Sequence, residues 1–576
     1  MPIHNSDVAK VFSQVADLLE IQGANQFRVR AYRNAARTVE GLSRSVADML
    51  REGEDLSKIS GIGKDLAGKI ADIVETGGLE LLQELQQQLP GDLPRLMELE
   101  GVGPKKIKVL HEKLGIKSVA DLKKAAQEQR LRELAGFGAK TEEKLLRAIE
   151  RYEARKGERQ RFRLPQAQQI AEDLLEYLKH TEGVKRIVVA GSYRRQQETV
   201  GDLDILASCK KGADIMERFV GYEDVERVVA QGSTRSTVVL RSGIQVDLRV
   251  LPDVSYGAAV HYFTGSKAHN IAIRKLGVQR KLKINEYGIF KGDERISGHD
   301  EEDVYKAVDL PWIPPELRED RGEIDAARKG KLPQLVTLED IQGDLHAHTN
   351  RTDGRQSLEE MAQGARQRGY RYIAITDHSQ RVTVAGGLKP EQVHEQIDEI
   401  DALNEKLKGF QVFKGIEVDI LKDGTLDLPD DTLARLEMVI ASVHSYFDLT
   451  REQQTRRIVK AISNPHVRIL GHPTGRMIGS RDPYDVDMEE IVKAARKHGC
   501  CLEINAHPER LDLNDTYCRL AKDHGVTLAI NTDAHRVRDY DFIRFGVGQA
   551  RRGWLEKTDV LNTRNLTDMR EFVRRR

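Results

Sequence analysis

The spacing of apolar residues changes twice along the chain. Up to about residue 156, apolar residues recur at intervals of three and four, and Val8, Phe12 and Val15 fall on one face of a predicted helix. After a further helix over 166–180, the apolar positions gather into short β-rich runs such as "RIVVAGS" and "IQVDLRVL". This pattern predicts a helical region followed by an α/β sheet.

From about residue 340 onward, a strand-and-helix unit repeats. The strand-like runs each lead into a potential metal ligand or its neighbour; they are "IQGDLHAH", "YIAITDH", "VFKGIE", "MVIASVH", "RILGH", "CLEIN" and "TLAINTDAH". Most are separated by helix-like stretches such as 357–368 and 489–498. Alternating strands and helices imply parallel strands, and ligands at the strand ends imply a barrel-like site.

Composition excludes several classes of protein. Lys+Arg and Asp+Glu both number 91, so any nucleic-acid surface must come from local patches rather than net charge. No apolar run approaches a membrane span, and the N-terminus lacks a signal-peptide core. The four cysteines form no CxxC pair, which argues against a disulfide framework or a zinc ribbon. We expect a cytoplasmic protein without membrane contact.

A short signal recurs three times in the helical region, as "ISGIGKD" at 59–65, "LEGVGPKK" at 99–106 and "LAGFGAKT" at 134–141. One such stretch is ordinarily only a turn, but three copies indicate a repeated unit. Gly-x-Gly exposes backbone N–H groups at a helix start beside a lysine, which suits a phosphate and is blind to base sequence. The pattern predicts three helix-hairpin-helix elements, with DNA-binding glycines at Gly61, Gly63, Gly101, Gly103, Gly136 and Gly138.

The stretch "GSYRRQQETVGDLDIL" places Asp202 and Asp204 at the start of an apolar strand. Side chains at i and i+2 share a face, and adjacent carboxylates repel unless a cation lies between them. Asp247 stands inside another β run; alone it is more simply an ordinary surface aspartate, although burying it unpaired would be costly. Together the three predict a site for two Mg²⁺ or Mn²⁺ ions. Ser192 and Arg195 can then hold a polyphosphate.

At these residues the chain resembles the family X DNA polymerases. The stretch "YFTGSKAHNIAIRKLGVQRKLKINEYGIF" at 262–290 is similar to the family's nucleotide-binding and thumb region, and the resemblance runs through residues 1–310. It implies that Asp202, Asp204 and Asp247 are catalytic metal ligands, with Asp247 assisting attack by the primer 3′-hydroxyl. It implies nucleotide-binding roles for Arg163, Ser192, Arg195, Gly201, Tyr262, Phe263, Gly265, Lys267, Asn270 and Arg274.

Within that set, the resemblance implies that Tyr262 and Phe263 crowd the sugar and that Asn270 and Arg274 face the minor groove. Two positions depart from the animal beta-type enzyme. Lys267 replaces an aspartate against the incoming base, and Gln245 replaces an arginine near the third carboxylate. Neither change removes a metal ligand, so we expect catalysis to persist and Lys267 to strengthen nucleotide binding when metal is scarce.

The N-terminal segment resembles the family's lyase domain less closely. The Schiff-base lysine position falls on Lys69, but the companion lysine is replaced by Asp65, and a histidine-lysine pair by Phe27 and Arg28. A lyase lysine must be partly deprotonated, which nearby cations promote. An exposed helix lysine without chemistry is an equal alternative, so we expect weak lyase activity at most.

The C-terminal strand ends supply a second set of ligand-type residues: His346, His348, Asp353, His378, Glu417, His444, His472, Asp533 and His535. A single histidine on an apolar run is usually a core or surface residue, but a set of this size predicts a metal centre. Imidazole and carboxylate ligands suit Zn²⁺, Mn²⁺ or Fe²⁺ better than Mg²⁺ or Ca²⁺. The absence of cysteine ligands argues against a closed structural zinc site and favours a hydrolytic centre.

This pattern is similar to the polymerase and histidinol phosphatase (PHP) domain, a distorted (βα)7 barrel with three metal ions, over about 341–576. The resemblance implies that one ion is held by His346, His348, Glu417 and Asp533, that Glu417 bridges to a second ion held by His444 and His472, and that Asp353, His378 and His535 hold the third. Since no ligand position is lost, we expect an active phosphoesterase.

A family X polymerase followed by a PHP domain implies repair gap filling with 3′–5′ exonuclease or related end processing. We expect a monomer that binds gapped or primer-template DNA and dNTPs. The expected segments are a lyase-like helical domain with the first hairpin (1–80), a helix-hairpin-helix region (81–156), a nucleotidyltransferase palm (157–253), a thumb (254–315), a linker (316–340) and the PHP barrel (341–576).

Two other functions are compatible with parts of the sequence. One is a template-independent nucleotidyltransferase joined to a small-molecule phosphatase, and the other is a DNA end-bridging protein whose barrel is only scaffold. The hairpin repeats and the "YFTGS" region argue against the first, since neither is needed without duplex DNA. The full ligand set argues against the second.

Overall fold

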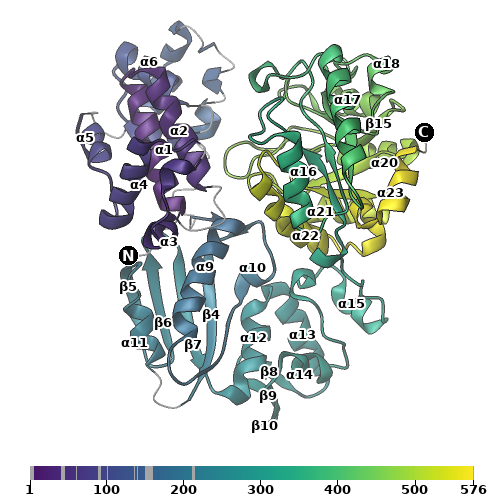
Figure 1. Ribbon diagram of the computed structural model, residues 1–576. Helices are drawn as coiled ribbons and strands as arrows, with labels where there is room; N and C mark the ends of the chain where they lie inside the picture. The colour runs from purple at the N-terminus through teal and green to yellow at the C-terminus, as the bar shows by residue number, and fades with distance from the viewer. Residues whose placement is uncertain are drawn as a thin grey trace.

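The computed structural model of the chain describes residues 5–40, 46–59, 61–88, 93–99, 102–134, 137–138, 141–143, 145–149, 160–210 and 214–574. Helices come first, then a mixed sheet with a small α+β unit, and then a barrel (Figure 1). Gly101 and Gly136, two of the predicted DNA-binding glycines, lie outside the described residues.

The N-terminal helices pack through the apolar face that their spacing predicts. Val8, Phe12 and Val15 are fully buried on α1, and Phe12 meets Tyr32 of α2 edge to face with ring centroids 5.6 Å apart. The bounds are α1 Asn5–Ile21, α2 Gln26–Glu40, α3 Val46–Arg51, α4 Lys64–Thr76, α5 Glu80–Gln88, α6 Pro104–Leu114 and α7 Val119–Gln127.

The predicted nucleotidyltransferase region is a five-stranded sheet in the order β2-β4-β7-β6-β5. Only the central pair, β4 and β7, runs parallel, and α9 and α11 cover the sheet's apolar face. The bounds are β1 Phe162–Arg163, α9 Leu164–Lys179, β2 Val184–Val189, α10 Gly191–Arg194, β3 Thr199–Val200, β4 Asp202–Cys209, α11 Ile215–Val220, β5 Val225–Gln231, β6 Arg235–Leu240 and β7 Gln245–Leu251.

A small unit of helices and a three-stranded antiparallel sheet follows. Its elements are α12 Tyr256–Thr264, α13 Lys267–Gln279, β8 Lys283–Asn285, β9 Gly288–Lys291, β10 Glu294–Ser297 and α14 Glu301–Lys306. The segment expected as a linker contains α15 Glu323–Arg328 and is well packed: Leu317 and Ala327 are buried in one apolar cluster with this unit.

The C-terminal half is a parallel seven-stranded sheet whose order, β11 to β17, follows the chain. A parallel bridge links Ala347, at the end of β11, to Ala534, three residues beyond β17. With the strand order, this contact confirms the predicted (βα)7 barrel. The strands are β11 Gly343–Ala347, β12 Tyr372–Ile375, β13 Gln411–Asp419, β14 Met438–Ser442, β15 Val467–Leu470, β16 Cys501–Asn505 and β17 Leu528–Asn531. The helices are α16 Leu358–Gln367, α17 Pro390–Lys406, α18 Asp430–Leu433, α19 Arg451–Ile462, α20 Met488–His498, α21 Asp515–Asp523, α22 Ile543–Arg552 and α23 Leu566–Arg574.

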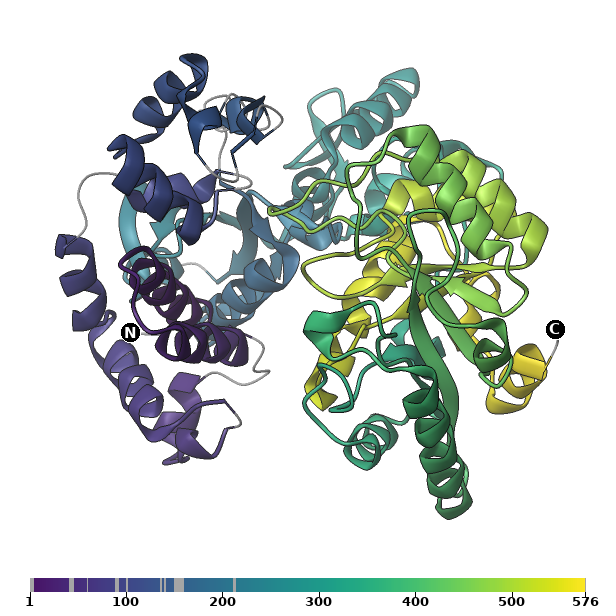
Figure 2. The ribbon, with the colours of Figure 1, turned by 90° about the horizontal axis from the view of Figure 1, so that it is seen from above.

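The barrel shares apolar contacts with the rest of the chain. Its Leu511 and Phe545 belong to the cluster under the five-stranded sheet, and its Trp554 packs in the cluster of the α12–α15 unit. The N-terminal helices lie beside the barrel (Figure 2), where Arg538 Nη2 donates to the Thr38 carbonyl at 3.0 Å. Among the described residues, no helix is long and apolar enough to cross a membrane.

Candidate active sites

The three predicted catalytic carboxylates meet on the two parallel strands. Asp204 on β4 stands directly opposite Asp247 on β7, and Asp202 stands opposite Gln245. Asp202 and Asp204 share a face because strand side chains alternate. Gly191 adopts φ +64°, and a Cβ there would lie 2.7 Å from Asp204 Oδ2, so the turn before β4 approaches this carboxylate as closely as only glycine allows. The pairing register of β4 and β7 therefore brings the predicted catalytic carboxylates together.

The electrostatics of this site suit a cation. Burial, followed by the charges of Asp202 and Asp247, raises the pKa of Asp204 to about 7. Burial would also raise the pKa of Asp247, but hydrogen bonds from Thr237, Gln245 and Arg235 lower it overall. Asp247 is thus ionised, and its negative charge disfavours ionisation of the neighbouring Asp204. A divalent ion bound between these carboxylates would remove the repulsion.

Arg235 is a residue that sequence reasoning missed. Its Nη2 donates to Asp247 Oδ1 at 3.1 Å from the adjacent strand β6, while Gln245 Nε2 donates to Asp247 Oδ2 at 2.9 Å. An arginine therefore contacts the third carboxylate although Gln245 occupies the position where the animal enzyme carries one. Only the β6–β7 pairing reveals it, because Arg235 lies in no recognisable motif.

The arginine-rich turn meets the junction of α12 and α13. Arg195 Nη1 donates to the Thr264 carbonyl at 2.6 Å, and Arg194 Nη1 donates to the Thr264 hydroxyl at 2.8 Å. Asn270 Nδ2 donates to the Tyr262 carbonyl at 2.6 Å. The two motifs that predicted a nucleotide site, far apart in sequence, thus lie together.

The remaining predicted nucleotide-binding residues are spread around this junction. Ser192 lies on α10, Gly201 immediately precedes β4, and Gly265 ends α12. Phe263 packs edge to face on Tyr262 and lies under the Arg249 guanidinium. Lys267 and Arg274 are exposed on α13. Arg163 instead donates from Nη1 to Glu509 Oε1 of the barrel at 2.6 Å. Their roles in binding nucleotide stay predictions.

The barrel gathers the second ligand set at the C-terminal ends of its strands. Three groups of ligand atoms lie close enough to hold an ion: His348, Asp353, His378 and His535; His346, His348 and Asp533; and His378, Glu417 and His444. His348 and His378 each belong to two groups, so the division of ligands among three ions stays a prediction. His472 is outside these groups but contacts Glu417.

Glu417 lies at the centre of this cluster. Its Oε1 is 2.9 Å from His472 Nε2 and 3.3 Å from His444 Nε2. Its Oε2 is 2.9 Å from His378 Nδ1 and 3.5 Å from His346 Nε2. Each carboxylate oxygen thus faces different histidines, which is the arrangement a bridging ligand needs.

The residues fit a metal cluster in their chemistry as well as their positions. Nitrogens of His346, His348 and His378 and the Glu417 Oε2 atom are buried without a hydrogen-bond partner among the described residues. Such groups are costly to bury unpaired, and divalent ions would satisfy them together.

A second layer of carboxylates orients these ligands, and sequence reasoning missed it. Glu503 on β16 contacts His346 Nδ1 at 2.7 Å and accepts from the His472 backbone N–H at 2.7 Å. Asp419 lies 3.3 Å from His444 Nδ1. Carboxylates behind metal-binding histidines fix the ring orientation. The signal was a carboxylate inside each apolar strand, in "CLEIN" and "GIEVD".

Of the four described glycines predicted to bind DNA, three have the geometry that phosphate binding requires, and Gly61 instead approaches Thr38 and Arg355. Gly63 and Gly103 are the N-caps of α4 and α6, and Gly138 accepts from the Thr141 N–H at 2.8 Å in the third repeat. All three are exposed, and a Cβ at any of them would meet nothing within 4 Å. Their N–H groups are therefore open to a ligand at a helix N-terminus.

Lys69 lies on α4 and pairs with Asp65. Burial would lower the pKa of Lys69, but its hydrogen bond to Asp65 and its contact with Tyr32 raise it overall. A Schiff-base lysine needs the opposite shift, so this environment favours a structural lysine.

Comparison with known proteins divides the chain into the same domains as the structure does. Family models match as a helix-hairpin-helix domain over 3–79, a SAM-like helix-hairpin-helix tandem over 93–151, a DNA polymerase beta palm over 163–242, a DNA polymerase beta thumb over 259–319 and a PHP domain over 344–507. The DNA polymerase/3′-5′ exonuclease PolX of Bacillus subtilis is 39% identical over 577 residues, which cover 100% of both chains. The chain belongs to the PolX family.

The barrel of this PolX-family chain also has relatives of its own. A probable phosphatase of Thermoanaerobacter sp. (strain X514) is 31% identical over 242 residues, which cover 40% of this chain and 94% of the phosphatase. A probable phosphatase of Caldanaerobacter subterraneus is 33% identical over 218 residues, covering 36% and 79%. The chain therefore joins the polymerase beta fold to a barrel whose relatives also occur without it.

Proposed function

We propose that this chain is a DNA-directed DNA polymerase that fills gaps during DNA repair, and that its barrel removes nucleotides from 3′ ends. The observation that carries the polymerase is the register that sets Asp204 opposite Asp247 with Asp202 on the same face. The similarity to PolX over the full length supports both halves.

In nucleotide addition, Asp202, Asp204 and Asp247 would hold Mg²⁺ or Mn²⁺, which when bound would supply positive charge to the triphosphate and to the primer hydroxyl. Asp247 is kept ionised by Thr237, Gln245 and Arg235, so it can accept the proton of the 3′-hydroxyl. Arg195 is fixed through the Thr264 carbonyl at the edge of this site, where it would meet the phosphates.

In the barrel, the nine predicted ligands would hold Zn²⁺, Mn²⁺ or Fe²⁺, which when bound would supply the nucleophile at neutral pH and bind the scissile phosphate. Glu417 would bind ions on two sides of the cluster, because its two carboxylate oxygens face different histidines. Glu503 and Asp419 hold the imidazoles in the orientation that leaves their other nitrogens for the ions.

Primer extension on a one-nucleotide gap, with and without a template base, tests the polymerase. A gap-filling enzyme adds the complementary nucleotide and needs the template base. Addition without a template would instead support a template-independent transferase, and absence of any addition would support an end-bridging protein.

A phosphomonoesterase is a second candidate for the barrel, because its relatives include proteins named probable phosphatases. Two substrates separate the candidates: an oligonucleotide with a 3′-hydroxyl and the same oligonucleotide with a 3′-phosphate. Release of nucleotides from the first favours the exonuclease, and release of phosphate from the second with no shortening favours the phosphatase.

A further inference from the structure

A cavity of about 290 Å³ lies between the N-terminal helices and the barrel. The N-terminal domain contributes Thr38 and Ile59 to its lining, and the barrel contributes Arg355, Arg368, Arg536 and Arg538. Four guanidinium groups around one small cavity make it a candidate anion site. We call it the arginine pocket.

The positive charge of the arginine pocket is only partly neutralised. Arg368 pairs with Asp541, with Nε 2.7 Å from Oδ1, and Arg538 Nε lies 3.8 Å from Asp539 Oδ1. Within the described parts of the chain, no carboxylate forms an ion pair with Arg355 or Arg536. Arg536 Nη1 donates to the Arg37 carbonyl at 3.4 Å, a contact that leaves its charge without a counterion. Guanidinium groups held together with so little neutralisation favour a bound anion.

A buried hydroxyl adds a second, independent feature. Thr38 is 2% exposed, and its Oγ1 has no hydrogen-bond partner among the described residues. Gly61 adopts φ +88°, and a Cβ there would lie 3.1 Å from both Thr38 Oγ1 and Arg355 Nη1. The first Gly-x-Gly motif, the hydroxyl and the free guanidinium therefore come together. A hydroxyl and a guanidinium are both donors that phosphate oxygens accept.

The arginine pocket lies next to the barrel's metal ligands. Arg536 directly follows His535, and Arg355 is two residues beyond Asp353. The Arg355 N–H donates to the His535 carbonyl at 2.9 Å, which ties the two segments together. An anion in the pocket would thus sit beside the ligand group formed by His348, Asp353, His378 and His535.

We propose that the arginine pocket binds a backbone phosphate of the single DNA strand whose 3′ end lies at the barrel's metal centre. The proposal rests on the proposed exonuclease function and adds its strand-binding subsite, which the N-terminal domain and the barrel build together. A free phosphate offers the same chemistry, so the experiment includes it as a separate ligand.

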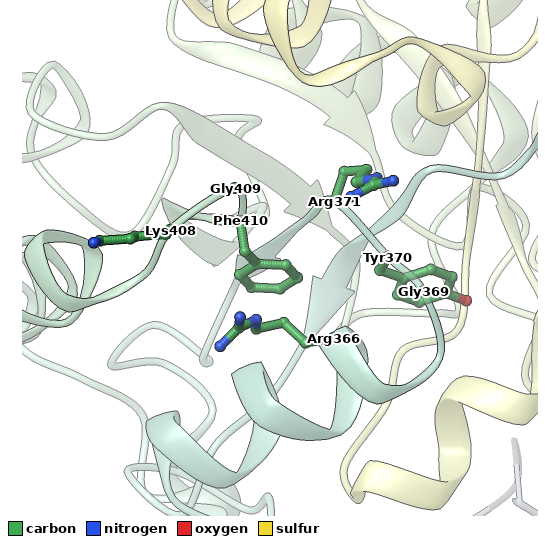
Figure 3. A pocket seen from close by; sticks show the side chains of 7 residues that line it. All are labelled: Arg366, Gly369, Tyr370, Arg371, Lys408, Gly409 and Phe410. Atoms are coloured by element: carbon green, nitrogen blue, oxygen red, sulfur yellow. The ribbon is translucent and has the colours of Figure 1, made fainter.

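The test compares a double variant, Arg355→Gln with Arg536→Gln, against a matched control, Arg366→Gln with Arg371→Gln. The control arginines line another cavity, of about 260 Å³, at the N-terminal ends of the barrel strands, opposite the metal ligands (Figure 3). Binding of a labelled oligothymidylate is measured by fluorescence anisotropy over a salt series in EDTA, which prevents cleavage.

We expect the double variant to bind the strand roughly tenfold more weakly, since hydrogen bonds to charged groups are lost. The slope of log affinity against log salt should fall by about 0.7 for each lost phosphate contact. The control should keep the affinity and slope of the wild type. Equal affinity and slope in both variants would overturn the proposal. It would also fail if the double variant lost only inorganic-phosphate binding, which would assign the pocket to free phosphate.

Hydrolysis of bis(p-nitrophenyl) phosphate, measured after metal is added back, distinguishes failure of the arginine-pocket proposal from failure of the proposed nuclease function. This diester has no second phosphate to reach the arginine pocket, so the double variant should hydrolyse it at the wild-type rate. A loss of this activity would overturn the proposal, because the arginines would then act at the metal centre. If the wild type itself cleaves neither the diester nor DNA, the proposed nuclease fails instead.

Discussion

The Arg163 guanidinium of the palm donates to the Glu509 carboxylate of the barrel, with Nη1 and Oε1 2.6 Å apart. The next residue, Arg510, has its Nε 3.6 Å from Oδ2 of the predicted metal ligand Asp533. One barrel loop therefore contacts a predicted triphosphate-binding residue on one side and the barrel's metal centre on the other. Glu509 therefore neutralises a guanidinium that we predict binds the triphosphate.

Glu509→Gln should therefore ease nucleotide binding. The pair is partly exposed, so its loss is worth about 1 kcal/mol or less, and the KM for dNTP should fall by up to about fivefold with kcat unchanged. Steady-state gap filling measures both constants. Glu198→Gln is the control, because it removes an interface pair with Arg476 that does not involve Arg163. A KM that rises in Glu509→Gln would mean that Glu509 orients Arg163 for the nucleotide.

Metal binding at the polymerase site should depend on pH in a defined direction. With its pKa raised to about 7, Asp204 is protonated below that pH and must release the proton when the metal binds. The apparent Mn²⁺ affinity should hence fall by up to about tenfold per pH unit below about 7 and level off above it. The difference between the wild type and Asp202→Ala in titration calorimetry isolates this site, because the barrel's ions contribute equally to both proteins. An affinity independent of pH from about 6 to 8 would contradict the assignment.

Chelation should destabilise the barrel. Several of its buried ligand nitrogens and the Glu417 Oε2 atom make no hydrogen bond within the described residues, and bound metal would supply their partners. Ions at 100-fold excess over their dissociation constant contribute about 2.7 kcal/mol, so EDTA should lower the barrel's melting temperature by roughly 5–10 °C. Calorimetry measures this shift, and re-added Mn²⁺ should reverse it. Glu417→Ala should show a smaller EDTA shift than the wild type, because it removes one ligand of the cluster; an equally large EDTA effect in that variant would place the stabilising ions away from Glu417.

Replacing the hairpin glycines with larger residues should weaken DNA binding without unfolding the helices. Gly63 and Gly103 have φ of −79° and −90° as N-caps, so Gly63→Val and Gly103→Val are sterically accessible. Their side chains would block phosphate approach, lowering affinity for all sequences alike and reducing the salt slope by about 0.9 per contact. Gly68→Val, on the exposed side of α4, is the control. A changed sequence preference with an unaltered slope would refute phosphate binding at these turns.

The parts of the fold that could be predicted are those encoded by local pattern. Alternating apolar strands and helices specify parallel neighbours, so the barrel and its ligands at the strand ends followed from the sequence. The placement of the three carboxylates on adjacent strands was predicted from the motifs and strand pattern, whereas the register that sets Asp204 opposite Asp247 was not. What could not be predicted are side-chain contacts that depend on strand register, such as Arg235 with Asp247, or on contact between distant elements, such as Arg163 with Glu509.

The segment expected as a linker, residues 316–340, shows a second limit of prediction from sequence. Its dense charge indicates a solvated connector, yet Arg318 and Glu323 are fully buried. Arg318 Nη1 donates to Glu301 Oε1 at 2.6 Å, and Glu323 Oε1 lies 2.6 Å from His269 Nδ1. Buried charges are tolerated when they are paired, and the partners lie in other elements. Composition alone cannot distinguish such a segment from an exposed one.

The central claim is that one chain carries two metal centres with separate chemistry, and a crossed pair of variants tests it most directly. Nucleotide addition and 3′ shortening are measured on the same gapped substrate for Asp202→Ala and His346→Ala. Each centre supplies several kcal/mol to its own transition state, so each variant should lose about 10³ in one rate and little in the other. Full-strength 3′ shortening by His346→Ala, or its loss in Asp202→Ala, would contradict this account.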